Sequence, residues 1–168
     1  MRWLQYRNKQ ADAALRLAQA RALRELTAAH GAGLVVNDDV RLALEVGADA
    51  VHVGRDDADP RGLIGARPLA IGVSCYDRFE LAQAAWQAGA HYVAFGAVFA
   101  SPTKPHAVRA PLELIDHARA KGMHVAAIGG IDASNIRTVA AHGAHAAALI
   151  TAVYGASDPE TAARTACG

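Results

Sequence analysis

One short pattern recurs along the chain and limits its fold more than any other feature. Alanine-rich sequence of helical character leads into a Gly-Ala pair, and a short run of Val, Ile, Leu or Ala comes after it. The pair stands at Gly31, Gly47, Gly65, Gly89 and Gly143, with Gly122-Met123 as a sixth variant. Glycine suits the left-handed position that ends a helix, and a buried parallel strand has a continuous apolar sequence. The repeat therefore predicts successive strand–helix units with a parallel sheet.

The pattern predicts seven strands, with helices in the intervals and a weak helix near residues 59–64. The expected strands cover residues 2–7, 33–37, 50–54, 69–74, 92–97, 124–129 and 146–151. This order suits either a doubly wound sheet or a β/α barrel. Polar or glycine residues follow six of the strands, and a barrel brings the carboxyl ends of all its strands to one mouth. We therefore expect an α/β protein of the TIM-barrel, (β/α)8, type with one of its eight βα units missing.

The length, charge and composition of the chain limit the number of domains and the kinds of partner that we expect. At 168 residues we expect a single domain over residues 1–168. Lys and Arg number 17 against 16 Asp and Glu, a balance that argues against a nucleic-acid partner. Cys75 and Cys167 lack the spacing of metal ligands, and no apolar run is long enough for a membrane span. We expect a cytoplasmic protein with no membrane partner.

Aspartates follow two consecutive predicted strands, in VVNDDV and VHVGRDD. Asp38 and Asp57 would lie at the mouth on neighbouring loops. Asp39 and Asp56 would turn away from it. Two carboxylates with open coordination positions suit Mg²⁺ shared with a substrate phosphate. The alternative is that each aspartate caps the helix that follows it.

The first strand carries cations where a core strand would be apolar. Gln5, Arg7 and Lys9 stand at every second position, so in an extended strand they share one face. At the carboxyl end of the strand that face meets the mouth. With Lys104 they would form a cationic clamp for a magnesium diphosphate. The alternative is a solvated edge strand.

The long loop FGAVFASPTKPHA follows the strand at 92–97. Ser101, Thr103 and Lys104 offer two hydroxyls and a cation between Pro102 and Pro105. Such a loop suits a phosphate ligand or a lid. The alternative is an ordinary proline-rich surface turn.

The last two strands end in AAIGGID and ALITAV. Gly129 and Gly130 would let backbone N–H groups approach an anion. We expect a helix starting near Asp132 to direct its positive end to the same place. Barrels frequently bind phosphate at these two loops.

The sequence offers no nucleophile with a base beside it. Ser74-Cys75 follows a predicted strand end, but no paired base is identified for either residue. The eight histidines do not show the spacing of a metal site and are interpreted as packing or surface residues.

Taken in order, these motifs resemble the thiamine-phosphate synthase family. The matching stretches are QYRNK, NDDVRLALEVGADAVHVGRDD, IGVS, FGAVFASPTKP, AIGGI and LITAV, which run across almost the whole chain. The resemblance implies a transferase that joins 4-amino-2-methyl-5-hydroxymethylpyrimidine diphosphate to a thiazole phosphate, giving thiamine phosphate and diphosphate. In this dissociative chemistry the diphosphate leaves first, the aminopyrimidine stabilises the methylene cation, and the thiazole nitrogen attacks.

Carried over by position, the resemblance implies three sets of ligands. The pyrimidine diphosphate would be held by Gln5, Arg7, Lys9, Asn37, Ser74 and Lys104. Mg²⁺ would be held by Asp38 and Asp57. The thiazole phosphate would be held by Ser101, Thr103, Gly129, Gly130, Ile150 and Thr151. Arg7, Ser74 and Lys104 are the residues expected to act in the reaction itself.

The chain departs from the family pattern in small ways. Ser101 stands where the family often has Thr, and Arg55-Asp56-Asp57 stands where it commonly has Gln-Glu-Asp. The related thiazole tautomerase branch is an alternative. It typically has a His where Ala97 stands and lacks the paired aspartates, so both features favour the synthase.

The larger departure is that the family's first strand and helix are absent from this chain. We therefore expect either a truncated version of a longer protein or a chain that depends on a partner, for example in a homo-oligomer, because the strands at 2–7 and 146–151 would present unpaired edges that invite association. A phosphate-ligand binding module that has lost catalysis is the alternative from a different functional class.

Overall fold

The computed structural model describes residues 2–54, 69–100 and 108–167. Contacts within the chain divide it into two compact units, Met1–Gly72 and Val73–Gly168. Each unit is described by itself. The predicted weak helix at 59–64 and the predicted Gly65 junction lie outside the described residues.

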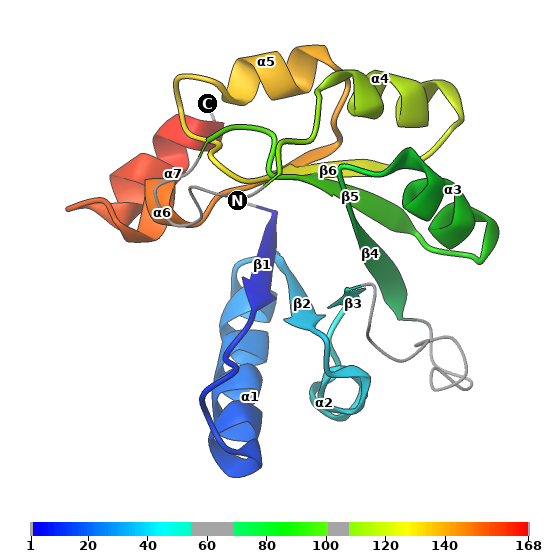
Figure 1. The fold of residues 1–168 in the computed structure, drawn as a ribbon. Coiled ribbons are helices and arrows are strands. Elements are labelled where there is room, and N and C mark those ends of the chain that lie inside the picture. The colour runs from blue at the N-terminus through cyan, green and yellow to red at the C-terminus, as the bar shows by residue number, and fades with distance from the viewer. Residues whose placement is uncertain (1, 55–68, 101–107, 168) are drawn as a thin grey trace. The chain divides into compact units, whose positions relative to one another are not determined.

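The first unit alternates strands and helices (Figure 1). Its elements are β1 (Trp3–Tyr6), α1 (Ala13–Ala29), β2 (Gly33–Asn37), α2 (Val40–Val46) and β3 (Ala50–Val53). The strands are parallel and ordered β1-β2-β3, with Leu34 opposite Leu4 and Val51 opposite Val36. Helix α1 packs on β1 and β2, and α2 packs on β2 and β3. The side chains of Leu34, Val36 and Val51 are fully buried and form the core of this unit.

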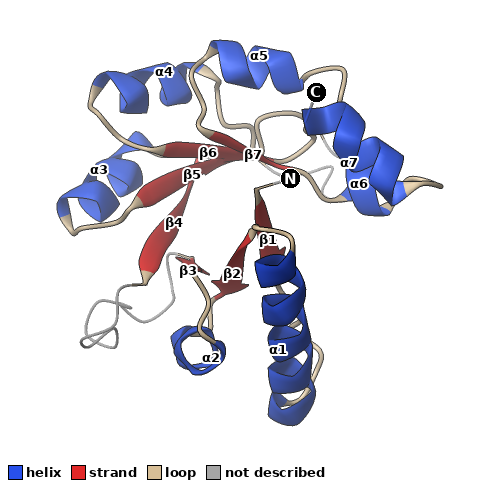
Figure 2. Ribbon diagram, turned by 180° about the vertical axis from the view of Figure 1, so that it is seen from behind, coloured by secondary structure: helices blue, strands red, loops and turns tan. Residues whose placement is uncertain are grey.

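The second unit repeats the same order. Its elements are β4 (Ala70–Tyr76, where the division falls), α3 (Phe79–Gln87), β5 (Tyr92–Gly96), α4 (Glu113–Ala120), β6 (Val125–Ile128), α5 (Ile136–Ala141), β7 (Ala146–Ala148), α6 (Thr151–Tyr154) and α7 (Pro159–Cys167). The strands β5, β6 and β7 are parallel and neighbours in chain order. Helices α3, α4 and α5 cover one face of them (Figure 2). Phe95, Val125 and Ile115 fill the layer between sheet and helices.

The glycine junctions behave as predicted wherever the structure describes them. Their backbone φ angles lie between 62° and 95° at Gly31, Gly47, Gly89, Gly122 and Gly143. At Gly47 this left-handed residue ends α2, and its N–H donates to the carbonyls of Ala43 and Leu44. The seven predicted strands are confirmed among the described residues. The last one ends at Ala148 rather than at residue 151, because Thr151 already begins α6.

Two local predictions are wrong. Ser74 and Cys75 do not follow a strand end, since β4 continues to Tyr76. No helix starts near Asp132, because α5 begins at Ile136. The Asp132 carboxylate instead accepts hydrogen bonds from the backbone N–H and the hydroxyl of Ser134 and holds a turn. Within the described ranges no helix is both long and apolar enough to cross a membrane.

Candidate functional site

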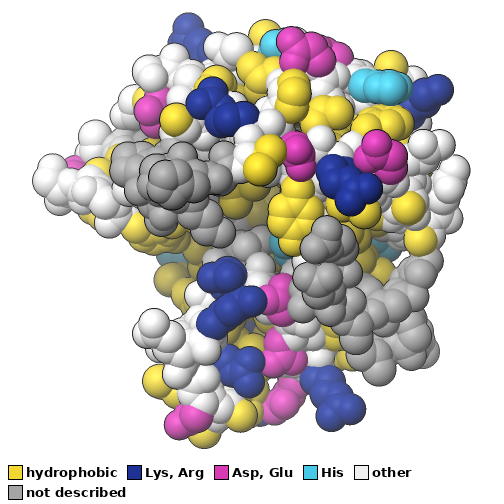
Figure 3. Space-filling view, in the orientation of Figure 1, with side chains coloured by type: hydrophobic (Ala, Val, Ile, Leu, Met, Phe, Trp, Pro, Cys, Tyr) yellow, Lys and Arg dark blue, Asp and Glu magenta, His cyan; other side chains and the backbone are white. Residues whose placement is uncertain are grey.

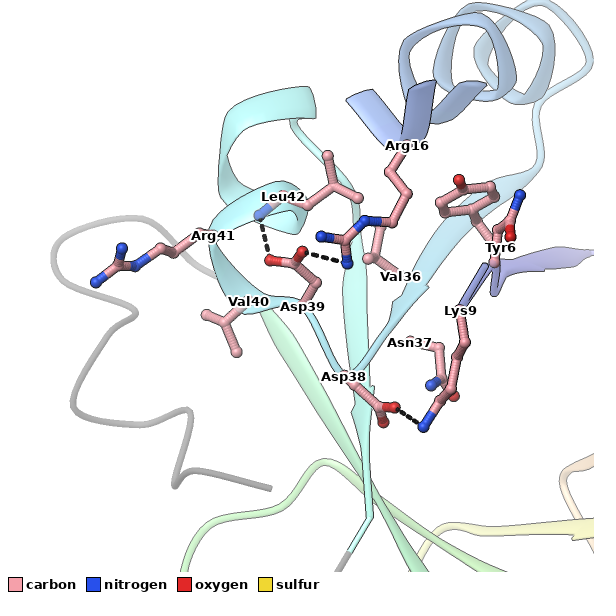
Figure 4. A pocket seen from close by; sticks show the side chains of 11 residues that line it. Tyr6, Lys9, Arg16, Val36, Asn37, Asp38, Asp39, Val40, Arg41 and Leu42 are labelled. Atoms are coloured by element: carbon pink, nitrogen blue, oxygen red, sulfur yellow. Dashed lines mark hydrogen bonds and ion pairs between the residues drawn. The ribbon is translucent and has the colours of Figure 1, made fainter. Parts of the chain in front are cut away.

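A pocket of about 440 Å³ lies in the first unit, at the carboxyl ends of β1 and β2. Its polar lining comes from four places. Asn8 and Lys9 follow β1, and Asn37 ends β2 with Asp38 and Asp39 after it. Arg16 reaches in from α1, and Arg41 lies on α2 (Figure 4). On the face that Figure 3 shows, basic and acidic side chains lie next to one another over this unit. The structure therefore brings the predicted ligands Lys9, Asn37 and Asp38 together in one pocket.

Asp38 leaves the strand in an unusual backbone conformation. Its φ angle is 63°, in the left-handed region of the backbone that residues other than Gly, Asn and Asp seldom adopt. The N–H of Asp38 donates to the carbonyl of His52 in β3 at 2.8 Å, and the N–H of Asp39 donates to the carbonyl of Asn37 at 2.8 Å. These two bonds hold the turn that directs the Asp38 side chain into the pocket.

The Asp38 carboxylate faces a cation. Its Oδ2 lies 2.9 Å from Lys9 Nζ, and Figure 4 shows the two side chains pointing toward each other. The Asp38 side chain is 27% exposed and that of Lys9 is 61% exposed. Both groups are therefore within reach of a ligand from solvent.

Asp39 faces the other way and serves the fold. Its Oδ1 accepts a hydrogen bond from the N–H of Leu42 at 2.9 Å and so caps α2. Its Oδ2 accepts from Arg16 Nη1 at 3.3 Å. The helix-capping alternative thus applies to Asp39, whose carboxylate points to Leu42 and Arg16 and not to Lys9. Because Asp39 nevertheless lines the pocket, the prediction that it turns away from the mouth is not borne out.

His52 lies close to Asp38 but stays uncharged. Burial within β3 is the main effect on its ring and lowers its pKa from 6.5 to about 4, although the Asp38 carboxylate acts in the opposite direction. At neutral pH the imidazole is therefore neutral. Lys9 supplies the positive charge beside Asp38.

The predicted clamp on β1 forms only in part. The strand ends at Tyr6, so Arg7 and Lys9 do not continue its alternation and the prediction of one shared strand face is wrong for them. Gln5 is exposed on the face opposite Tyr6, whose hydroxyl donates to Gln19 of α1 at 2.9 Å. Arg7 is exposed too, and neither Gln5 nor Arg7 lines the pocket. Lys9 alone of the three reaches Asp38.

The glycine pair of the second unit follows β6. The φ angles are 97° at Gly129 and 67° at Gly130. A Cβ on Gly130 would collide with the Ala100 carbonyl and with Phe99, and one on Gly129 would lie 2.5 Å from the Cβ of Ala97. Close packing on the segment after β5 therefore explains both glycines without an anion.

Three of the other predicted ligands lie within the described residues, and four lie outside them. Ile150 precedes α6 and is 61% exposed, and Thr151 is the first residue of that four-residue helix. Ser74 lies inside β4 and is half-buried. The remaining predictions, Asp57, Ser101, Thr103 and Lys104, lie outside the described residues.

The chemistry of Cys75 is unfavourable for a nucleophile. The residue is buried, and burial raises the pKa of its thiol to about 12. A thiolate is the reactive form of cysteine, so this side chain is inert at neutral pH.

Sequence reasoning missed Arg16. Its position near the start of α1 follows from Asp12, whose side chain caps the helix by accepting from the N–H of Leu15 at 2.8 Å. A cap at Asp12 places residue 16 one turn into the helix, beside the end of a parallel neighbouring strand. Recognition of that cap is the one signal in the sequence that could have directed attention to Arg16.

The family model described as thiamine monophosphate synthase matches residues 1–153. The thiamine-phosphate synthase of Chromobacterium violaceum is 54% identical, over 99% of this chain and 82% of that protein. The thiamine-phosphate synthase of Xanthomonas campestris pv. campestris is 53% identical, over 95% of this chain and 78% of that protein.

Among solved structures, thiamine phosphate pyrophosphorylase from Pyrococcus furiosus matches with a TM-score of 0.87 and 34% identity. The match covers 98% of this chain and 80% of that one. The prediction of an α/β fold of the TIM-barrel type is confirmed by this likeness. With sequence, fold and relatives in agreement, the chain belongs to the thiamine monophosphate synthase family.

Proposed function

We propose that the chain makes thiamine phosphate, by joining 4-amino-2-methyl-5-hydroxymethylpyrimidine diphosphate to a thiazole phosphate with release of diphosphate. The family match over residues 1–153 is the observation that carries this function. The chain is accordingly a transferase of thiamine biosynthesis. Relatives more than half identical over nearly the whole chain favour this activity over the tautomerase alternative.

The first unit supplies the groups for the diphosphate. Lys9 and Asn37 line one pocket and present an ammonium and an amide to it. A hydrogen bond from a charged donor to a phosphate oxygen is worth about 1.5–3 kcal/mol. Gln5 and Arg7, on the same segment, can reach a ligand because their side chains are exposed. We propose that these four side chains bind the pyrimidine diphosphate, while Ser74 and Lys104 stay predictions.

The pocket offers a magnesium ion the Asp38 carboxylate, and the part of the chain that the structure describes brings no three His, Cys, Asp or Glu side chains together at a metal site. Carboxylate oxygens are the ligands that Mg²⁺ prefers, and the Asp38 carboxylate already holds a cation, the Lys9 ammonium, at 2.9 Å. We propose Asp38 as a magnesium ligand, together with Asp57. Bound magnesium would neutralise negative charge on the diphosphate.

The second unit supplies the proposed site for the thiazole phosphate. Gly130, Ile150 and Thr151 lie at the ends of β6 and β7, the place where barrels frequently bind phosphate. We propose these residues as ligands, with Gly129 alongside and with Ser101 and Thr103 as further predictions. Because the two glycines are also required for packing, their substitution would not test the phosphate site by itself.

The reaction needs positioning more than acid–base groups. The bond between the methylene carbon and the diphosphate oxygen breaks, and its electron pair leaves with the diphosphate. The lone pair of the thiazole nitrogen then forms the new bond to the carbon. The work of the chain is to hold both reactants in line and to stabilise the departing charge. This division of labour is consistent with a buried, protonated Cys75 thiol.

The test is product formation by the purified chain. We expect thiamine phosphate to appear when both substrates and Mg²⁺ are present, and we expect Asp38→Asn to reduce the rate strongly. Glu45→Gln is the matched control, since Glu45 lies on α2 and pairs with Arg21 away from the pocket. A folded chain that binds both substrates without turnover would instead support the binding-module alternative. Conversion of the thiazole without any pyrimidine would support the tautomerase.

A further inference from the structure

The turn that carries Asp38 is anchored by backbone hydrogen bonds and by the side chain of Asp39. Backbone bonds fix the N–H groups of Asp38 and Asp39, but the position of a left-handed residue also depends on how the next residue is anchored. Here the next residue is Asp39, and both of its carboxylate oxygens are engaged. One accepts from α2 at Leu42, and the other accepts from α1 at Arg16.

The two adjacent carboxylates also need different electrostatic surroundings. Asp38 and Asp39 are consecutive, and like charges so close oppose each other. Arg16 lies against Asp39, and Lys9 lies against Asp38, so each carboxylate has its own cation (Figure 4). Because Arg16 balances the charge of Asp39, the Lys9 ammonium is left to balance the charge of Asp38.

The placement of Arg16 is poor for a contact that only stabilises the fold. Its Nε is buried and has no hydrogen-bond partner among the described residues. A buried donor without a partner costs about 1–3 kcal/mol. Its ion pair with Asp39 is also long, at 3.3 Å, whereas α1 already pairs with Glu45 through Arg21 at 3.1 Å and with Asp49 through Arg24 at 2.6 Å.

From these observations we propose that Arg16 and Asp39 form a positioning pair that fixes the Asp38 turn and keeps its carboxylate directed at the cation-binding place in the pocket. Neither residue contacts the reacting groups in this proposal. The inference rests on the proposed function, because it takes Asp38 as a metal ligand. It adds to that function two residues that act on the site through the backbone of a third.

The experiment compares Arg16→Met with Arg21→Met in the full chain. Both changes remove an ion pair between α1 and the segment of α2, but only the first touches the turn. The readouts are Mn²⁺ affinity without substrate, measured by electron paramagnetic resonance, the urea midpoint of unfolding, and kcat/KM for the pyrimidine diphosphate. Asp39→Asn is added because asparagine still caps a helix but lacks the charge. Arg16→Lys tests rescue.

We expect Arg21→Met to change the unfolding midpoint only slightly, and Arg16→Met to keep or raise it, because methionine removes a buried donor that has no partner among the described residues. Only Arg16→Met and Asp39→Asn should weaken Mn²⁺ binding and lower kcat/KM by about 10-fold or more, since a misplacement of about 1 Å can cost ~100-fold. Arg16→Lys should restore part of the loss. Equal effects of Arg16→Met and Arg21→Met on Mn²⁺ affinity, or no effect of either, would overturn the proposal.

The result also separates this inference from the proposed function. If the unaltered chain binds Mn²⁺ but makes no thiamine phosphate, the function fails while the Mn²⁺ comparison still decides the role of Arg16. If the unaltered chain does not bind Mn²⁺, the role of Asp38 as a metal ligand and the positioning pair are both wrong.

Discussion

Replacement of Lys9 by methionine should change the affinities for the two ligands of the pocket in opposite directions. The change removes the ammonium that lies 2.9 Å from Asp38 and keeps most of the side-chain length. Lys9 and a divalent cation compete for the same carboxylate, so affinity for Mn²⁺ without substrate should rise. The pair is partly solvated, with side-chain exposures of 61% and 27%. Exposed ion pairs are worth about 0.2–1 kcal/mol, which corresponds to a gain of about 1.4- to 5-fold.

The diphosphate should respond much more strongly. Loss of one charge-assisted contact of about 1.5–3 kcal/mol corresponds to weaker binding by roughly 10- to 150-fold. Titration calorimetry with inorganic diphosphate and Mn²⁺ titration, each at low and at high salt, measure the two effects. The Mn²⁺ gain should shrink at the higher salt, because screening already weakens the competing pair there.

Arg41→Met is the matched control for this prediction. Arg41 also lines the pocket, but Figure 4 shows its side chain pointing away from Asp38. Arg41→Met removes one positive charge from the pocket, as Lys9→Met does, but it removes no ion pair with Asp38. If Lys9→Met weakened both ligands, or changed them no more than Arg41→Met, the competition between Lys9 and the metal would be refuted.

Two further predictions concern stability. Gly130→Ala should destabilise the chain by about 1–3 kcal/mol in urea unfolding, because the new methyl group meets the Ala100 carbonyl; Gly31→Ala, with a similar φ of 62° and open space around it, should cost only the backbone strain of about 1 kcal/mol, and equal losses would contradict the packing argument. His52 has a lowered pKa of about 4 in the folded chain against 6.5, so the unfolded chain binds its proton first as the pH falls. Stability should therefore decline between pH 6.5 and 4 by up to about 3 kcal/mol, and a parallel decline in His52→Gln would show that other groups cause it.

The repeated local signals explain why much of the fold could be predicted. The glycine that ends a helix and the apolar run of the next strand lie close together in the sequence, so a short stretch of residues is enough to predict both. Gly47 and β3 illustrate this, since the left-handed cap and the buried strand occur where the pattern puts them. The Asp38 environment was predictable for a related reason, because parallel strands bring their carboxyl ends together.

The remaining features depend on contacts that no local pattern carries. The end of β1 at Tyr6 cannot be read from the alternation of Gln5, Arg7 and Lys9, which suggests a longer strand. The sequence also cannot distinguish a glycine required by an anion from one required by a neighbouring backbone. At Gly130 that neighbour is the chain after β5, at Phe99 and Ala100. The role proposed for Arg16 likewise depends on the packing of α1 beside β2.

The left-handed backbone at Asp38 also affects how this chain can be improved. A residue with a φ of 63° is held in a conformation that glycine adopts more readily. The backbone at position 38 therefore favours glycine, whereas the proposed metal ligand requires the carboxylate of aspartate. Asp38→Gly would relieve the backbone strain, but it would also remove the ion pair with Lys9 and the carboxylate from the pocket. At position 39 selection for thermal stability would instead retain the aspartate, because its side chain caps α2. Two neighbouring aspartates that look interchangeable in the sequence would thus diverge under the same pressure, and a stabilised variant of this chain should be screened for the loss of one and the retention of the other.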